Sequence, residues 1–228
     1  MKQCIARRAP LVAALAGLIA AAFAAPAIAA PGWSVTFDGA SGPALKWMKA
    51  NGWKEQRGDA DRWRLADGAL HTSQDEDSTT IGTERGFPID ANAAPRLRMR
   101  FKVSAWPKKG DLRRKGTEDA ALRVFVIFDR GGGLLSPPDT LGYAFASTNR
   151  VGSVVTSARF DNVKFIPVAG PNGYDGGWIE VERDVVADYR KAFGKAPPRI
   201  KAIGIKSDGN NTDAKAAATI DRIEFLPR

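Results

Sequence analysis

Hydrophobic and polar residues alternate along much of the chain after residue 30, which is the period of a β-strand. The clearest case is RLRMRFKVS at residues 96–104. Its apolar row is Leu97, Met99, Phe101 and Val103, and its basic row is Arg96, Arg98, Arg100 and Lys102. We expect the apolar row to be buried and the basic row to face solvent or an anionic ligand.

The stretch ALRVFVIFD at 121–129 is apolar on both faces, which predicts a central strand. Similar short runs predict further strands at 33–38, 62–65, 69–73, 79–83, 141–147, 153–157, 163–168, 178–186, 200–206 and 218–226. Asp67-Gly68 predicts a tight hairpin between two of them. Helical spacing occurs only at 43–53 and 187–193. About ten short strands with one or two short helices predict an all-β sandwich or barrel.

The first 29 residues have the pattern of a signal peptide. Lys2, Arg7 and Arg8 precede an apolar run at 11–25, and Ala27-Ile28-Ala29 offers a small-residue cleavage site. We therefore expect residues 1–29 to be removed near Ala29, leaving 30–228 as a single periplasmic or secreted domain. The alternative is a membrane anchor, but the run is short and Pro26 closes it, so we expect no stable membrane span after cleavage.

Composition narrows the chemistry of the mature chain. The only cysteine, Cys4, lies in the leader, so the mature chain has no disulfide and no thiolate metal ligand. The formal net charge is +9, of which the leader supplies three charges. A basic balance suits an anionic envelope polymer, although ordinary solubility explains it equally well. Nucleic acid is not expected, because no basic stripe carries a stacking motif.

The residues for most hydrolytic chemistry are absent. His71 is the only histidine, which excludes a zinc site built on two or three histidines. A serine triad would have to use His71, and the chain has no nucleophile-elbow motif. Paired carboxylates remain as the basis of a polysaccharide-acting enzyme. The candidate pairs are Glu118 with Asp119, Glu180 with Glu182, and Asp208 with Asp213.

The loop that follows residues 200–206 is rich in oxygen-bearing side chains. Asp208, Asn210, Thr212 and Asp213 surround Gly209, and hard cations such as Ca²⁺ take oxygen ligands from loops of this kind. These four residues are our candidate metal ligands. The alternative is a polar hairpin loop in which Asp and Asn bind backbone groups.

A sugar site needs an aromatic platform beside fixed polar groups. Trp178, Tyr143, Arg123 and Asp119 supply both kinds of group and are the candidate ligand-binding residues. Asp119 and Arg123 also fit a buried ion pair with no role in binding.

Four segments resemble a family of exported bacterial proteins known as domain of unknown function 3047. They are EDAALRVFVIF (118–128), LGYAFAS (141–147), WIEVERDVVADYRKAFGKAPPRIKAIGIKSDGNNT (178–212) and IDRIEF (220–225). The chain keeps the family's residues at Asp119, Arg123, Tyr143, Asp188, Phe193, Gly194, Asp208, Asn211 and Thr212. It departs at Asn210, where the family has Asp, and near Phe145, where the family has Trp. The resemblance implies a galactose-binding-like, jelly-roll antiparallel β-sandwich, an architecture often used for sugar recognition.

We therefore expect an exported, noncatalytic and monomeric β-sandwich protein that binds a carbohydrate or envelope glycan. Two alternatives remain open at this point. One is a carboxylate-dependent enzyme acting on polysaccharide, and the other is an envelope scaffold that uses the basic row of 96–102.

Overall fold

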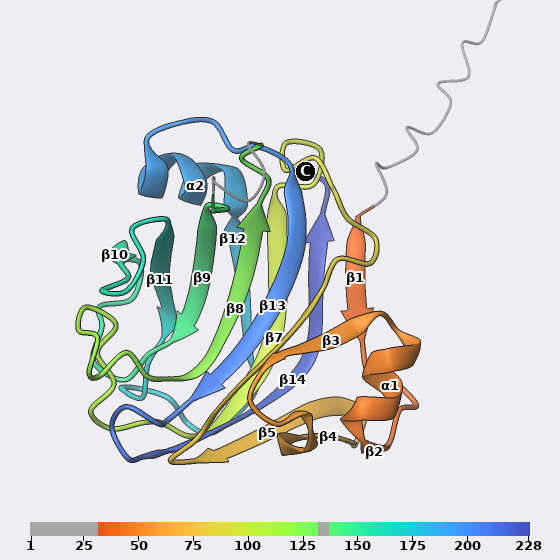
Figure 1. The fold of residues 1–228 in the computed structure, drawn as a ribbon, viewed down its shortest axis with the longest axis vertical. Helices are drawn as coiled ribbons and strands as arrows, with labels where there is room; N and C mark the ends of the chain where they lie inside the picture. The colour runs from red at the N-terminus through yellow and green to blue at the C-terminus, as the bar shows by residue number, and fades with distance from the viewer. Residues whose placement is uncertain (1–31, 132–136) are drawn as a thin grey trace, which may run out of the picture.

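The computed structural model describes residues 32–131 and 137–228, and these form two seven-stranded β-sheets packed face to face (Figure 1). The first, here called the β7 sheet, has the strand order β12-β7-β14-β5-β4-β2, with β1 also paired to β14. The second, the β8 sheet, has the order β10-β11-β9-β8-β13-β6-β3. In Figure 1 the β8 sheet faces the viewer, and β7 and β14 lie behind it.

The strands of the β7 sheet are β1 (Trp33–Thr36), β2 (Gly42–Pro43), β4 (Trp63–Ala66), β5 (Ala69–Asp75), β7 (Arg96–Ala105), β12 (Ile179–Asp184) and β14 (Lys215–Leu226). Those of the β8 sheet are β3 (Trp53–Arg57), β6 (Ser78–Thr83), β8 (Ala120–Phe128), β9 (Thr140–Phe145), β10 (Val155–Thr156), β11 (Val163–Ala169) and β13 (Ile200–Asp208). The α-helices of the described residues are α1 (Ala44–Ala50) and α2 (Val185–Phe193). This confirms the prediction of an all-β, largely antiparallel sandwich with two short helices.

Alternation along β7 and β8 builds the core between the sheets. The apolar row of β7 is buried against the apolar residues of β8, as its sequence predicts. In β8, Leu122, Val124 and Val126 enter the core, while Arg123 and Phe125 belong to the outer face. The core is completed by large side chains such as Trp63 and Phe225, both of which are fully buried.

Local signals fix two of the connections. Asp67 and Gly68 form the two-residue hairpin between β4 and β5, and both have positive φ, as a type I′ turn requires. Asp184 is the N-cap of helix α2, and its carboxylate accepts a hydrogen bond from the Ala187 amide at 2.9 Å. Gly194 is the C-cap of the same helix. The helix lies at the end of the sandwich near the C-terminus (Figure 1).

Two features of the sheets differ from the sequence prediction. Strand β3 was not expected, because four of its five residues are exposed and it has no apolar alternation. Strand β11 pairs with β9 in parallel, although every other pairing among the described residues is antiparallel. The predicted signal peptide, 1–29, lies outside the described residues. Within those residues, no helix has the length and apolar character needed to cross a membrane.

Candidate functional site

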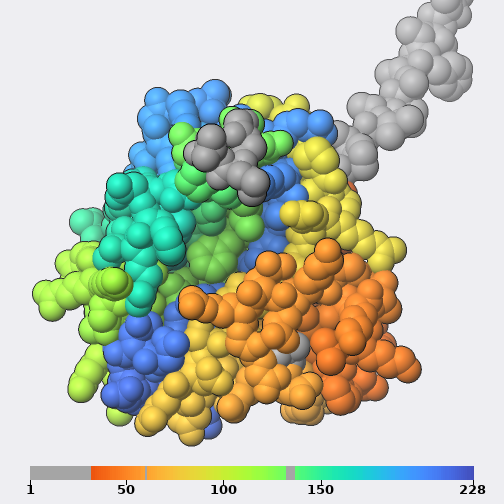
Figure 2. Space-filling model, in the orientation of Figure 1, coloured from red at the N-terminus to blue at the C-terminus, as the bar shows by residue number. Residues whose placement is uncertain are grey.

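A groove of about 780 Å³ lies on the outer face of the β8 sheet. Figure 2 shows this face hollowed over β8, between the orange segment that contains β3 and the teal segment of 150–165. Of the residues singled out from the sequence, the groove is lined by Glu118, Arg123, Asn210 and Asn211. It is lined by Arg57, Gly58, Asp77, Ser78, Glu118, Arg123, Phe125, Ser157, Arg159, Phe160, Val163, Phe165, Lys206, Asn210 and Asn211.

Four charged side chains meet at the inner wall of the groove. Arg123 is 1% exposed and donates a hydrogen bond to the Asp208 carboxylate, which is equally buried. Lys206 Nζ lies 2.5 Å from Asp208 Oδ2. Glu118 Oε1 lies 3.6 Å from Arg123 Nη1, and its other oxygen accepts a hydrogen bond from Ser157. Two cations and two anions thus form a balanced cluster, which we call the Arg123 cluster.

The register of the sheet explains this cluster. Lys206 of β13 lies directly opposite Arg123 of β8, so their side chains share the outer face. A bulge between Lys206 and Asp208 then turns the Asp208 carboxylate toward both cations. Asp119 does not pair with Arg123, so the ion pair considered from the sequence forms with Asp208 and Glu118 instead.

The electrostatics of the cluster follow from burial and mutual contact. Burial lowers the pKa of Lys206, and the Arg123 guanidinium lowers it further, while Asp208 acts in the opposite direction. Burial acts to raise the pKa of Asp208, but Arg123 and Lys206 outweigh it and hold that pKa below its ordinary value. Asp208 is therefore a carboxylate at neutral pH, held by two cations.

Three polar atoms at the groove remain buried without a hydrogen-bond partner among the described residues. They are Arg123 Nε, Asp208 Oδ1 and Ser78 Oγ. A buried polar group without a partner costs about 1–3 kcal/mol, so their concentration here is unusual for a purely structural cluster.

Aromatic rings form the floor beside the charges. Phe125 and Phe165 lie 6.4 Å apart, and the Arg123 guanidinium lies 5.6 Å above the Phe165 ring. Phe165 is 1% exposed and supports the floor from beneath, so Phe125, which is partly exposed, supplies the accessible ring. Gly142 on β9 makes room for both rings, since a Cβ there would come within 2.6 Å of Phe165. Phe160 extends this apolar surface and is 61% exposed. The groove therefore combines ring faces with charged groups fixed by packing.

The Asp208–Asp213 loop closes one side of the groove through Asp119. Asp119 is fully buried, and its carboxylate accepts hydrogen bonds from the Asn211 amide at 3.1 Å and from the Asn211 side chain at 2.7 Å. Thr212 Oγ1 donates a third, at 2.7 Å. Gly209 is required at the base of the loop, because a Cβ there would lie 2.0 Å from the Ala214 carbonyl oxygen. Asp119 therefore anchors the loop.

The four candidate metal ligands are not gathered around one point. Asp208 contacts Arg123 and Lys206, and Thr212 donates to Asp119. Asn210 Oδ1 accepts a hydrogen bond from Asn211. Asp213 is exposed, with φ of 46°, and lines a different hollow. Within the described residues no group of three or more His, Cys, Asp or Glu could hold a metal ion. The geometry favours the hairpin-loop alternative over a cation site.

Tyr143 and Trp178 lie away from the groove. Tyr143 is fully buried in the core and donates a hydrogen bond to Asp188 at 3.1 Å, and burial raises its pKa well above the ordinary value, with Asp188 adding to this effect. Trp178 is 43% exposed on the outer face of the other sheet, where Arg100 lies 4.7 Å from its ring centroid. Of the four candidate ligand-binding residues, Arg123 alone lines the groove, and Asp119 supports the groove from beneath.

The basic row of β7 does face outward, but most of it is paired with carboxylates. Arg96 contacts Glu182 at 2.7 Å, Arg98 contacts Glu224 at 2.9 Å, and Arg100 contacts Asp221 at 2.6 Å. The candidate carboxylate pair on β12 is occupied in the same way, because Glu180 contacts Arg222 at 2.9 Å. These side chains form an ion-paired surface rather than a free basic face or an open carboxylate pair.

A second aromatic hollow, of about 310 Å³, lies near Trp33, Trp47 and Trp53. Their ring faces are engaged with one another and with phenylalanines: Trp33 packs on Phe87 with centroids 5.2 Å apart, and Trp47 packs on Phe37 at 5.0 Å. These tryptophans therefore contribute mainly to packing.

The sequence reasoning missed Lys206, Ser157 and Phe165 as groove residues. A signal for Lys206 was present, since it is a lone cation two residues before Asp208 on a predicted strand. Ser157 and Phe165 had none, because they join the groove only through the parallel pairing of β11 with β9.

Comparisons with known proteins identify a family and include a match to a solved structure. No curated protein matches the chain at a significant level. Among solved structures, the K1 cleaved adhesin domain of Lys-gingipain (Kgp) from Porphyromonas gingivalis W83 aligns over 87% of this chain and 99% of that chain. Its identity is 10% and its TM-score 0.39, values too low to support a functional conclusion. Residues 51–224 match the model described as "Protein of unknown function (DUF3047)". The chain therefore belongs to the DUF3047 family, as its four resembling segments indicate.

Proposed function

We propose that the mature chain is an exported, noncatalytic and monomeric β-sandwich protein that binds a carbohydrate in the groove of the β8 sheet. The observation that carries this proposal is the position of the Arg123 cluster beside the partly exposed ring of Phe125 and the 61% exposed ring of Phe160. Sugar rings offer apolar C–H faces that pack on aromatic rings, and hydroxyl groups that both donate and accept hydrogen bonds. The groove has a surface for each.

The charges of the cluster favour a neutral sugar. Arg123 and Lys206 are balanced by Glu118 and Asp208, so the groove has no large excess of either sign at its inner wall. Hydroxyl groups of a neutral glycan can use the donors and acceptors of the cluster together, and Arg57 and Arg159 add further donors at the groove.

A hydrolytic role fits this geometry less well. A glycosidase needs one carboxyl group that is protonated and one that is free to act as base or nucleophile. Asp208 is held ionised between Arg123 and Lys206, and Glu118 is engaged by Ser157 and Arg123. We therefore expect no new reducing ends when the protein is incubated with neutral polysaccharides. If reducing ends do form, and fewer form with the Glu118→Gln variant, the protein is instead an enzyme.

The binding test is a neutral glycan array followed by calorimetric titration of each positive glycan. Phe160→Ala removes an exposed ring at the groove, so it should fold normally and weaken binding by about 10–100-fold, equivalent to about 1.4–2.8 kcal/mol. Trp178→Ala is the matched control, since it removes another exposed aromatic side chain from the opposite sheet. It should leave binding unchanged.

Two outcomes would overturn the proposal. One is the absence of any glycan signal with the mature, folded chain. The other is a glycan whose affinity falls with Trp178→Ala and not with Phe160→Ala, which would move the site to the other sheet. Export is tested separately, by finding whether the chain reaches the periplasm or medium only when residues 1–29 are present.

A further inference from the structure

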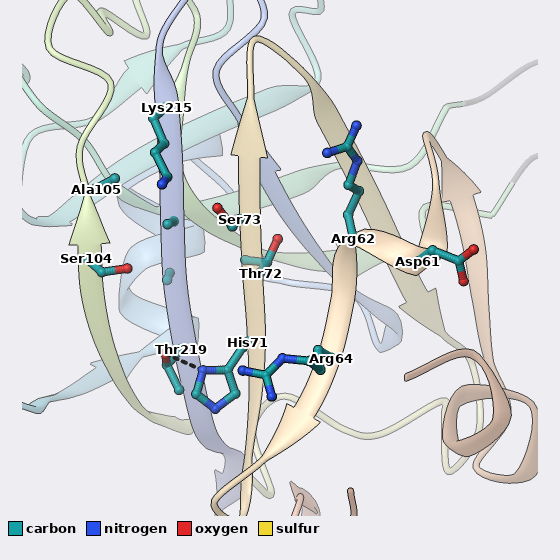
Figure 3. A pocket seen from close by; sticks show the side chains of 12 residues that line it. Asp61, Arg62, Arg64, His71, Thr72, Ser73, Ser104, Ala105, Lys215 and Thr219 are labelled. Carbon is teal, nitrogen blue, oxygen red and sulfur yellow. Dashed lines mark hydrogen bonds between the residues drawn. The ribbon is translucent and has the colours of Figure 1, made fainter. Parts of the chain in front are cut away.

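Another hollow surface begins on the outer face of the β7 sheet and continues onto the loops at one end of the sandwich. It consists of one depression of about 510 Å³ and another of about 730 Å³. Ser104, Ala105 and Lys215 line both depressions, so the two form one continuous trough. Figure 3 shows the first depression, with Lys215, Arg62 and Arg64 projecting from β14 and from the segment that leads into and forms β4.

The trough carries an excess of positive charge. Its lining includes five basic side chains and two carboxylates. The basic residues are Arg62, Arg64, Lys108, Lys109 and Lys215, and the carboxylates are Asp61 and Asp213. Arg62 lies 3.4 Å from Asp77, but the other four cations have no carboxylate partner within 4 Å among the described residues.

This distribution contrasts with the rest of the same face. Arg96, Arg98 and Arg100 each contact a carboxylate of a neighbouring strand, and Arg222 of β14 reaches Glu180 of β12 across β7. One half of the face is thus neutralised within the sheet, while the half around Lys215 is not. Uncompensated charges lining a concavity concentrate counter-ions there, because the low-dielectric walls focus the field.

The trough also contains an aromatic ring held in a fixed position. Trp106 packs edge-on against Tyr174, with centroids 5.7 Å apart and an interplanar angle of 78°. The Tyr174 hydroxyl accepts a hydrogen bond from the Val103 amide and donates one to the Gly177 carbonyl, so the supporting ring is itself anchored. Trp106 is only partly buried and lies beside the exposed Lys108 and Lys109.

His71 contributes to the shape of the trough. Its Nε2 lies 3.0 Å from the Ala66 carbonyl oxygen, and its Nδ1 lies 3.1 Å from Thr219 Oγ1, the contact drawn in Figure 3. Because a carbonyl oxygen can only accept, Nε2 is the donor of the first bond. Both nitrogens are engaged, and the small residues Ala105 and Ala217 leave the floor beside the ring open.

We infer that this trough binds a chain of acidic sugars, a polysaccharide with carboxylate groups along its length. Charge complementarity argues for an anionic ligand, and the ring of Trp106 between lysines suits the apolar face of a sugar that also carries a carboxylate. The continuity of the two depressions argues for a polymer rather than a single sugar. The charged and aromatic side chains of this site differ from those of the groove of the β8 sheet, although the Asp208–Asp213 loop borders both.

The probe is polygalacturonate, and the controls are dextran of similar length, phosphatidylglycerol vesicles and single-stranded DNA. Binding of the mature chain is measured at low and at physiological salt. The expected result is binding of polygalacturonate that weakens as salt rises, with no binding of dextran by the trough. Preferential binding of the vesicles or of DNA over polygalacturonate would overturn the inference.

Two matched double variants locate the site. Lys108→Glu with Lys109→Glu reverses two exposed charges in the trough, and Lys46→Glu with Lys49→Glu makes the same change of net charge on the exposed side of α1. The first should lower affinity for polygalacturonate on the order of tenfold or more, and the second should leave it within about threefold. Equal losses in both would show attraction to net charge alone and overturn the inference.

Trp106→Ala tests the aromatic contact. It should lower the affinity for polygalacturonate on the order of tenfold while leaving its salt dependence unchanged, because the lysines remain. Trp106→Phe keeps a ring and the packing on Tyr174, so it should restore most of the binding. Equal affinity of the alanine variant and the unmodified chain would refute a stacked sugar. Phe160→Ala should leave polygalacturonate binding unchanged, which separates this site from the groove.

Discussion

The clearest prediction concerns the contact between Asp119 and Thr212, because it decides what the Asp208–Asp213 loop does. If Asp119 anchors the loop, Asp119→Ala removes the acceptor of three donors, two of them from Asn211. Thr212→Val removes one of these donors and keeps the shape of the side chain. The loop should then lose stability in both variants, and neither loss should depend on a metal ion.

The magnitude follows from the hydrogen bonds. A hydrogen bond to a charged group contributes about 1.5–3 kcal/mol. Thr212 is partly exposed, so its loss should be near the lower limit, about 1.5 kcal/mol. Asp119→Ala should cost about 3 kcal/mol, since the freed donors of Asn211 can in part turn to water. In a domain of this size these losses correspond to falls in Tm of roughly 3–6 °C and 6–12 °C.

The assay is urea denaturation of the unmodified chain, both single variants and the double variant. The double variant should be about as unstable as Asp119→Ala alone, giving a coupling of about 1.5 kcal/mol between the two sites. The same four proteins are melted with Ca²⁺ and with EDTA. A coupling below about 0.3 kcal/mol would refute the anchoring role. A Tm that rises with Ca²⁺ and falls with EDTA would establish the cation site instead.

Three further predictions test other parts of the fold. Gly209→Ala should lower Tm strongly in thermal melts, because its Cβ would lie 2.0 Å from the Ala214 carbonyl oxygen, and an unchanged Tm would refute that contact. Tyr143→Phe should cost about 1.5 kcal/mol in urea denaturation and leave glycan affinity unchanged, since its hydroxyl donates to Asp188 in the core. The pKa of Asp111 lies below its ordinary value, chiefly through a hydrogen bond from the neighbouring arginine. Its stabilisation is therefore present above about pH 4 and lost as pH falls further, so the stability gap between the unmodified chain and Asp111→Asn should close in acid and not in base.

Much of the fold is predictable because local signals and burial agree. The alternation in 96–104 places its apolar row in the core, and the Asp67-Gly68 pair specifies the hairpin that the structure contains. Strand β3 is different, because WKEQR is an edge strand with mostly exposed side chains. Its extended conformation comes from pairing with β6, a partner more than twenty residues away, and no local periodicity reports such a contact.

The candidate site, like the fold, is only partly predictable, because its contacts join residues that are far apart in the sequence. Arg123 and Asp208 are both identified from the sequence, but their pairing is not. The sequence analysis considers Asp119 as the partner of Arg123, but four residues of an extended strand span about 13 Å, which is beyond the reach of an ion pair. The register of β13 against β8 instead brings Asp208, 85 residues away, to the guanidinium and leaves Asp119 to the loop. Register depends on every residue along both strands, so one side chain cannot reveal it.

Strand pairing also explains why the basic row of β7 is not a free basic surface, and where the uncompensated positive charge of this face lies. Carboxylates on β12 and β14 lie opposite its arginines and neutralise them. The positive excess of this face is left around Lys215, beyond the reach of those carboxylates. The balanced Arg123 cluster lies on the other sheet, and the Asp208–Asp213 loop borders both sites, through Asn210 and Asn211 at the groove and Thr212 and Asp213 at the trough. The charged and aromatic side chains of the two sites are different, so a neutral glycan and an acidic polymer should bind without competing, and the affinity for one should not change when the other is saturating. A change in either affinity would show that the two surfaces are coupled through the core or that they share a ligand.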